Sequence, residues 1–112
     1  MKKSEINFTI ELNDQKIPEK IRWSASDMEG NVPDDSKAIS LSIWDQASQN
    51  TLRIDLWTKD MPVHEMKRFY IDCIGGLAQS LLSATGDEFM SQEMNGLCDK
   101  LVEHVKEEEN KQ

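Results

Sequence analysis

Apolar and polar side chains alternate with a period of two in four short runs before residue 58. This alternation is typical of β-strands that bury one face. Asn13-Asp14 has the side chains of a tight turn, and the polar segment 45–50 separates the third run from the fourth. The pattern therefore predicts two β-hairpins. Their strands are expected over Ile6–Leu12, Lys16–Ser24, Ile39–Trp44 and Leu52–Trp57.

The apolar side chains of the first hairpin favour one pairing of its strands. Placing Phe8 opposite Ile21 and Ile6 opposite Trp23 brings apolar groups together on one face. Pro18 has no backbone N–H and cannot donate to the ladder. We therefore expect the second strand to start at a sheet edge or at a bulge.

An acidic, irregular segment follows from Ala25 to Lys37. Gly30 and Pro33 interrupt regular structure within it. Its composition predicts a surface loop. The loop carries the carboxylates of Asp27, Glu29, Asp34 and Asp35.

After Lys59 the apolar residues recur at steps of three and four, which predicts a long amphipathic helix. Pro62 suits the first turn of this helix, and Asp60 is expected to cap it. Gly75-Gly76 in its interior predicts close packing or a kink. The apolar stripe comprises Val63, Met66, Tyr70, Cys73, Ile74, Leu77, Leu81 and Ala84.

A second helix is predicted after Thr85, because Thr85 and Glu88 have the spacing of a capping box. The residues after Val105 are too charged to bury a face, so we expect 106–112 to be a frayed tail. The apolar stripe of this helix comprises Met90, Met94, Leu97, Leu101 and Val105.

These elements predict a two-layer α+β fold. Two hairpins are expected to form a four-stranded antiparallel sheet, and the C-terminal helical hairpin is expected to pack on one face of it. Residues 1–105 should form a single domain, since the chain of 112 residues has an ordinary length for one domain.

Charge and composition exclude several classes of function. The chain has 13 Lys and Arg against 21 Asp and Glu, a formal charge of −8. An acidic surface disfavours binding to nucleic acid or anionic membranes. The sequence lacks an apolar run long enough for membrane insertion and an N-terminal signal stretch, so a cytoplasmic location is expected. Cys73 and Cys98 are expected to be free thiols that act as small apolar residues.

The second hairpin carries the clearest candidate for a binding surface. Trp44 and Trp57 fall on the face opposite its aliphatic residues, together with Arg53 and Asp55. Large aromatic residues on an exposed sheet commonly anchor protein interfaces. The alternative is that loops or the start of the helix cover them. We also expect the two tryptophans to lie near opposite ends of the hairpin without stacking.

Catalytic and metal-binding patterns are weak in this chain. Asp60 and His64 stand four residues apart beside Glu65, and this spacing could present two ligands to a metal. A helix cap and a solvated histidine explain the same residues, and no third ligand is indicated. The sequence has no GxSxG, no HExxH and no phosphate-binding glycine loop. It therefore predicts no enzyme activity, no cofactor and no metal site.

Three stretches form a specific combination: SEINFTIEL at Ser4–Leu12, PEKIRWSA at Pro18–Ala25 and TLRIDLWTKDMPVHEMKRF at Thr51–Phe69. This combination resembles the GldC family of gliding motility-associated proteins. The resemblance covers most of the chain up to about Asp87, and RIDLWTKDMP is its most specific part. His64 departs from the family pattern, in which a carboxylate is expected.

The resemblance implies a small soluble accessory protein that is linked to the envelope machinery of gliding and brings no catalytic residues. Its expected partners are other proteins of the gliding or secretion machinery, and a homo-oligomer is a further option. An alternative function stays open. Four strands followed by two helices in an acidic chain are also similar to SecB-type export chaperones, which hold unfolded polypeptides on exposed apolar surface.

Overall fold

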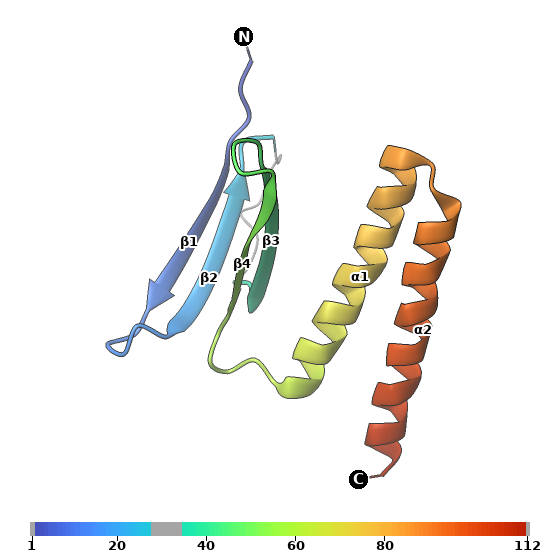
Figure 1. Ribbon diagram of the computed structural model, residues 1–112. Helices are drawn as coiled ribbons and strands as arrows, with labels where there is room; N and C mark the ends of the chain where they lie inside the picture. Colours follow the sequence, from blue (N-terminus) through green and yellow to red (C-terminus); the bar gives the residue numbers. More distant parts are fainter. Residues whose placement is uncertain (1, 28–34, 112) are drawn as a thin grey trace. The chain divides into compact units, whose positions relative to one another are not determined.

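The structure is a computed structural model that describes residues 2–27 and 35–111. The chain divides into two compact units, Met1–Met61 with the strands and Pro62–Gln112 with the helices. The predicted strands and helices are confirmed close to their expected bounds (Figure 1). The elements are β1 Ile6–Leu12, β2 Pro18–Ala25, β3 Ala38–Asp45, β4 Asn50–Trp57, α1 Val63–Thr85 and α2 Glu88–Asn110.

The strands form two separate antiparallel sheets, β1–β2 and β3–β4, in the first unit. The predicted four-stranded sheet is therefore wrong, whereas the α+β composition and the C-terminal helical hairpin are confirmed. The hairpins are linked where the Ser36 N–H donates to the Ile21 carbonyl at 2.7 Å and the Lys59 N–H donates to the Pro18 carbonyl at 3.2 Å. Alternation defines the faces of a strand but does not encode which edges pair, and this explains the error.

The register of β1–β2 also differs from the expected one. Phe8 lies opposite Trp23, so its expected pairing with Ile21 is wrong, as is that of Ile6 with Trp23. The turn sets the register, because Asn13 Oδ1 accepts hydrogen bonds from two backbone amides of the turn, at 2.8 and 3.0 Å. A shift by two residues keeps every side chain on its face, so the apolar pattern fits both registers.

The irregular start of β2 is confirmed by a shift in the ladder between Glu11 and Leu12, where Leu12 faces Pro18. Further along β2, Ile21 is buried. Its strand has a neighbour on each side at this point, β1 on one edge and the bridge to Ser36 on the other. Ile21 therefore marks the core of the first unit.

Part of the predicted acidic loop, residues 28–34, lies outside the described residues. At one end of the loop, Ser4 Oγ donates to Asp27 Oδ2 at 2.5 Å. At the other end, Arg22 Nε donates to Asp35 Oδ1 at 2.9 Å. Asp35 raises the pKa of Arg22 through this bond. Asp27 is thus tied to the segment before β1, and Asp35 is tied to β2.

Helix α1 begins without the predicted cap. Its N-cap residue is Pro62, which offers no side-chain hydrogen bond. The expected role of Asp60 as the cap is wrong, because the Asp60 carboxylate accepts a hydrogen bond from Thr58 Oγ1 at 2.6 Å. This bond lowers the pKa of Asp60. Within α1, Gly75 faces Cys98 of α2, and the helix runs without a break to Thr85.

The cap of α2 lies two residues beyond the predicted one. Asp87 is the N-cap, and its side chain accepts from the Met90 N–H at 3.0 Å. Thr85 remains in α1, where its hydroxyl donates to the Leu81 carbonyl at 2.8 Å. Gly86 ends α1 with φ of 73°, in the left-handed region that glycine adopts at low cost. The predicted box at Thr85 is therefore wrong, and α2 continues to Asn110.

Candidate functional site

The sheet formed by β3 and β4 has one aliphatic face and one polar face. On the polar face Ser40 pairs with Asp55, and Ser42 pairs with Arg53. Side chains two residues apart on a strand point to the same side, so these four groups lie together in the middle of the hairpin. The aliphatic face comprises Ile39, Leu41, Ile43, Leu52, Ile54 and Leu56.

Arg53 organises the polar face through one guanidinium group. Its Nη2 donates to Asp55 Oδ1 at 3.0 Å and to Ser40 Oγ at 2.7 Å. Its Nη1 donates to Ser42 Oγ, and its Nε donates to Asp55 Oδ2 at 3.3 Å. A planar guanidinium with five donors in a fixed fork suits this multiple contact. The four side chains are therefore held in one arrangement.

The Asp55 carboxylate is the acceptor at the centre of this network. Ser40 Oγ donates to its Oδ1 at 2.6 Å. This bond, followed by the hydrogen bond from Arg53, lowers the pKa of Asp55 below its usual range, although partial burial opposes the shift. Asp55 is thus a stable anion that is already paired, which suits a binding surface better than proton transfer.

Trp44 and Trp57 stand at opposite ends of this face. Trp44 pairs with Thr51 beside the turn, and Trp57 pairs with Ala38 at the other end. The two positions are about 20 Å apart along the hairpin, at roughly 3.3 Å per residue. The two rings are not in contact, and the tryptophan side chains are 63% and 49% exposed. We call the surface formed by Trp44, Trp57, Arg53, Asp55, Ser40 and Ser42 the Trp face.

Sequence reasoning identified the four large side chains of the Trp face but missed Ser40 and Ser42. The signal was present, because both serines alternate with the aliphatic residues of β3. Their role depends on the register, which places Ser40 opposite Asp55. The structure thus adds two hydroxyls that hold the charged pair in place.

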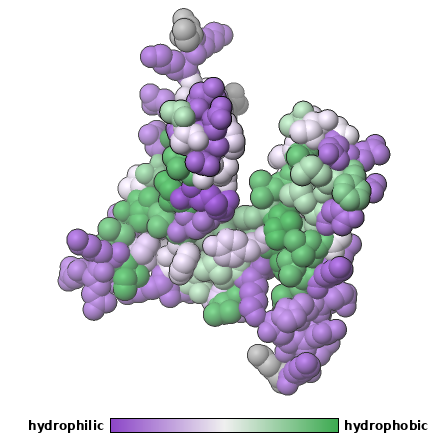
Figure 2. Space-filling view, viewed as in Figure 1, coloured by the Kyte–Doolittle hydropathy of each residue, from purple (hydrophilic) through white to green (hydrophobic). Residues whose placement is uncertain are grey.

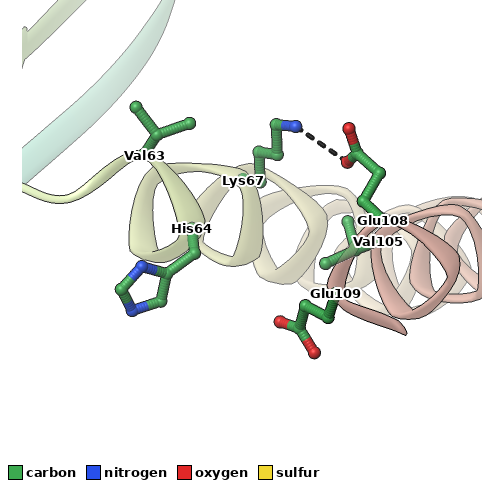
Figure 3. A pocket seen from close by; sticks show the side chains of 6 residues that line it. All are labelled: Val63, His64, Lys67, Val105, Glu108 and Glu109. Atoms are coloured by element: carbon green, nitrogen blue, oxygen red, sulfur yellow. Dashed lines mark hydrogen bonds and ion pairs between the residues drawn. The ribbon is translucent and has the colours of Figure 1, made fainter. Parts of the chain in front are cut away.

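The helical unit contains a shallow cleft of about 270 Å³ at the open end of the helical hairpin. Its lining comprises Val63, His64 and Lys67 from α1 and Val105, Glu108 and Glu109 from α2. Lys67 Nζ donates to Glu108 Oε1 at 2.8 Å, which lowers the pKa of Glu108. Figure 3 shows that His64 and Glu109 point away from this ion pair. A catalytic site requires polar groups that converge on one point, and the polar groups of this cleft do not converge.

The weak metal pattern at Asp60, His64 and Glu65 gains no further ligand. Within residues 2–27 and 35–111, no three His, Cys, Asp or Glu side chains come together in a way that could hold a metal ion. Asp60 binds the Thr58 hydroxyl, and His64 lies on the first turn of α1. The structure thus brings no third ligand from the described residues to Asp60, His64 and Glu65.

The thiols of Cys73 and Cys98 lie half-buried in the helical unit. Cys98 Sγ lies 3.7 Å from the Ile71 carbonyl, across the contact between the two helices. Cys98 thus occupies a packing position, as its place beside the apolar stripe predicts. Neither helix in the described part of the chain combines the length and apolar content that crossing a bilayer requires.

Comparison with known proteins identifies a family to which most of the chain is similar. The family described as "Gliding motility-associated protein GldC-like" matches residues 18–107. This span runs from the start of β2 to within the last turns of α2 and includes the whole Trp face. No curated protein and no solved structure matches the chain.

Proposed function

The chain belongs to the GldC-like family of gliding motility-associated proteins, and from this premise we propose that it is a non-catalytic accessory protein of gliding, which acts in the cytoplasm by binding another protein. The Trp face is the proposed binding surface. The partner is a protein of the gliding or secretion machinery.

One observation carries this proposal: two exposed tryptophans flank a network of paired polar side chains on a single sheet face. Tryptophan and arginine are the residues most often found at the energetic centre of protein interfaces. Because Ser40 and Asp55 already hold Arg53, binding would cost little side-chain entropy. A partner with two apolar pockets and polar groups between them fits this surface.

Deletion of the gene in a gliding host, followed by complementation, tests the proposal. The wild-type gene should restore colony spreading, whereas a gene with both Trp44→Ala and Trp57→Ala should not, at equal protein level. Phe89→Ala is a matched control, because Phe89 is an aromatic residue of α2 that is 70% exposed and lies outside the Trp face. Restoration by the double variant, or normal spreading of the deletion strain, contradicts the proposal.

A chaperone of the SecB type is the second candidate, and one observation favours it. Ile43, Leu52 and Ile54 on the aliphatic face of β3–β4 are each about half exposed. An exposed aliphatic surface can hold unfolded polypeptide. This candidate predicts that the purified chain suppresses aggregation of a denatured model protein, and that Leu52→Ser weakens the suppression. Unchanged aggregation at an excess of the chain rules it out.

A further inference from the structure

The outer edge of β1 has no paired strand in the described part of the chain. Among residues 2–27 and 35–111, the ladder joins β1 to β2 alone. The other edge of β2 is partly occupied, because the Ser36 N–H donates to the Ile21 carbonyl at 2.7 Å. The described part of the second unit consists of two helices, whose backbone groups bond within each helix. That unit therefore has no strand to offer to β1.

The ladder determines which backbone groups of β1 point to this outer edge. The Ser26 N–H donates to the Glu5 carbonyl at 2.9 Å, so Glu5 and Ser26 form a hydrogen-bonded pair. Hydrogen-bonded pairs alternate with non-hydrogen-bonded pairs along an antiparallel ladder. Ile6, Phe8 and Ile10 therefore turn their N–H and C=O groups away from β2. These groups form a row of backbone donors and acceptors along the outer edge.

β1 lacks the features that commonly keep a sheet edge from pairing. Protected edges are short, or they carry proline, lysine or a bulge. β1 has seven residues with the sequence INFTIEL, and the irregularity in its ladder lies at its end, between Glu11 and Leu12. Its isoleucine, phenylalanine and threonine residues favour extended pairing. Because a two-stranded sheet is only marginally stable, an added strand would also stabilise this hairpin.

The side chains of β1 favour an incoming strand with apolar residues at alternate positions. Ile6, Phe8 and Ile10 share one face of β1, and Ile6 is 64% exposed. In Figure 2 hydrophobic surface lies on the β1–β2 hairpin between its hydrophilic ends. Residues that lie opposite each other across a ladder share a face, so every second side chain of the incoming strand would pack beside this apolar row.

The net charge of the chain favours a basic occupant. On the polar face of the first hairpin, Glu11 lies opposite Lys20, and Arg22 Nε lies 2.9 Å from Asp35 Oδ1. The charges of this face are thus compensated locally and require no particular charge opposite them. The chain as a whole carries a formal charge of −8, which attracts a positively charged segment and repels a second copy of this chain.

We propose that the outer edge of β1 binds an extended, positively charged segment of a partner protein, which pairs with β1 as an added strand. In this mode of recognition, main-chain hydrogen bonds provide affinity and alternate side chains provide specificity. The occupant is an extended segment because only an extended backbone matches a row of strand donors and acceptors. The Trp face belongs to the other sheet, so this proposal and the proposed function can fail independently.

A short synthetic peptide in which valine alternates with lysine tests the proposal on the full chain. Its valines would lie opposite Ile6, Phe8 and Ile10, so their N–H groups would donate to β1. Methylation of the valine nitrogens keeps the charges and side chains but removes these donors, and it should weaken binding at least about tenfold. The matched control is methylation of the lysine nitrogens of the backbone, which point away from β1. It should leave binding nearly unchanged.

Two results of this titration would overturn the proposal. Equal binding of the two methylated peptides would show that charge alone attracts the peptide. No binding of the unmodified peptide at millimolar concentration would show that the edge does not accept a strand.

A variant of β1 tests the same edge from the side of the chain. Ile6→Pro removes an outward N–H at the first residue of β1, a position where an edge strand tolerates proline. It should weaken peptide binding several-fold, whereas Ile6→Val keeps the N–H and the apolar side chain and should bind like the wild type. Equal binding by the two variants contradicts the proposal.

Hydrogen exchange of the unmodified chain does not depend on any variant. The amides of Asn7 and Thr9 should be protected in the free chain, because they bond to β2. The amides of Phe8 and Ile10 should become protected only when the peptide is bound. Protection of Phe8 and Ile10 in the free chain would show that the edge is already paired, and it would overturn the proposal.

Discussion

Arg53 and Asp55 form an ion pair along one strand, with 3.0 Å between Arg53 Nη2 and Asp55 Oδ1. Because the two residues stand two apart on β4, they share a face and need no partner strand to meet. The serines of β3 then fix both groups through the ladder, Ser40 on Asp55 and Ser42 on Arg53. The polar centre of the Trp face is thus arranged before any partner binds.

The Asp55 carboxyl provides a direct test of this network. Since the hydrogen bond from Ser40 is the main cause of its lowered pKa, Ser40→Ala should raise the pKa of Asp55 toward the ordinary value of 3.8. Carboxyl-carbon NMR titration measures the change. Ser48→Ala is the control, because Ser48 bonds Asp45 at the turn instead. An unchanged pKa of Asp55 in the Ser40 variant contradicts the network.

The same shift predicts how stability depends on pH. The pKa of Asp55 is lowered in the folded chain, so its interactions stabilise the fold fully above the unfolded value near 3.8 and are lost as pH falls through the lower folded value. Asp55→Asn should therefore be less stable than wild type at neutral pH, and the difference should shrink below pH 3.8. Urea denaturation at both pH values measures this, and a constant difference refutes it.

Trp44 should contribute little to folding. Its side chain is 63% exposed, so Trp44→Ala should lower the free energy of unfolding by less than about 1 kcal/mol, whereas a buried tryptophan costs roughly 3–5 kcal/mol. Urea denaturation followed by circular dichroism measures the loss. A cost near the upper figure would show that Trp44 is a core residue and not a binding residue.

Two glycines should respond in opposite directions to the same substitution. Gly86→Ala should destabilise by about 1–2 kcal/mol, because Gly86 has φ of 73° and alanine is strained there. Gly96→Ala should stabilise by about 0.5–1 kcal/mol, since Gly96 lies inside α2 and an added Cβ meets nothing within 4 Å. Thermal unfolding of the two variants measures both changes in stability. If both substitutions stabilise the chain, or both destabilise it, the described backbone is contradicted.

Asp87 should be the residue that starts α2. Asp87→Ala removes the acceptor of the Met90 N–H and should cost about 1 kcal/mol, while Asp87→Asn keeps an acceptor and should cost much less. Chemical denaturation of both variants makes the comparison. Equal losses would show that the cap acts through charge and not through this hydrogen bond.

The alternation in the sequence was sufficient to assign residues to faces. It placed Trp44, Arg53, Asp55 and Trp57 on one side of the second hairpin, since the period of a strand determines this without knowledge of its partner. The alternation could not predict how the strands pair. Phe8 lies opposite Trp23 because Asn13 holds a particular turn, and the pattern of apolar residues is the same in either register.

The predicted capping residues of the two helices were wrong for a related reason. Asp60 and Thr85 have the residue types of caps, yet each has a different hydrogen-bond partner, the Thr58 hydroxyl and the Leu81 carbonyl respectively. A capping residue is defined by where the backbone leaves the extended conformation, and a sequence pattern locates this only to within a few residues. The roles of Ser40 and Ser42 in the Trp face could not be predicted either, because they depend on the strand register.

A protein partner at the Trp face is the central proposal, and photo-cross-linking in a gliding host tests it directly. A photoreactive amino acid at Thr51, opposite Trp44, should give an adduct of one discrete mass that disappears when Trp44→Ala and Trp57→Ala are added. The same amino acid at Glu103, an exposed position on α2, should not give this adduct. No adduct from Thr51, or one that persists without the tryptophans, contradicts the account.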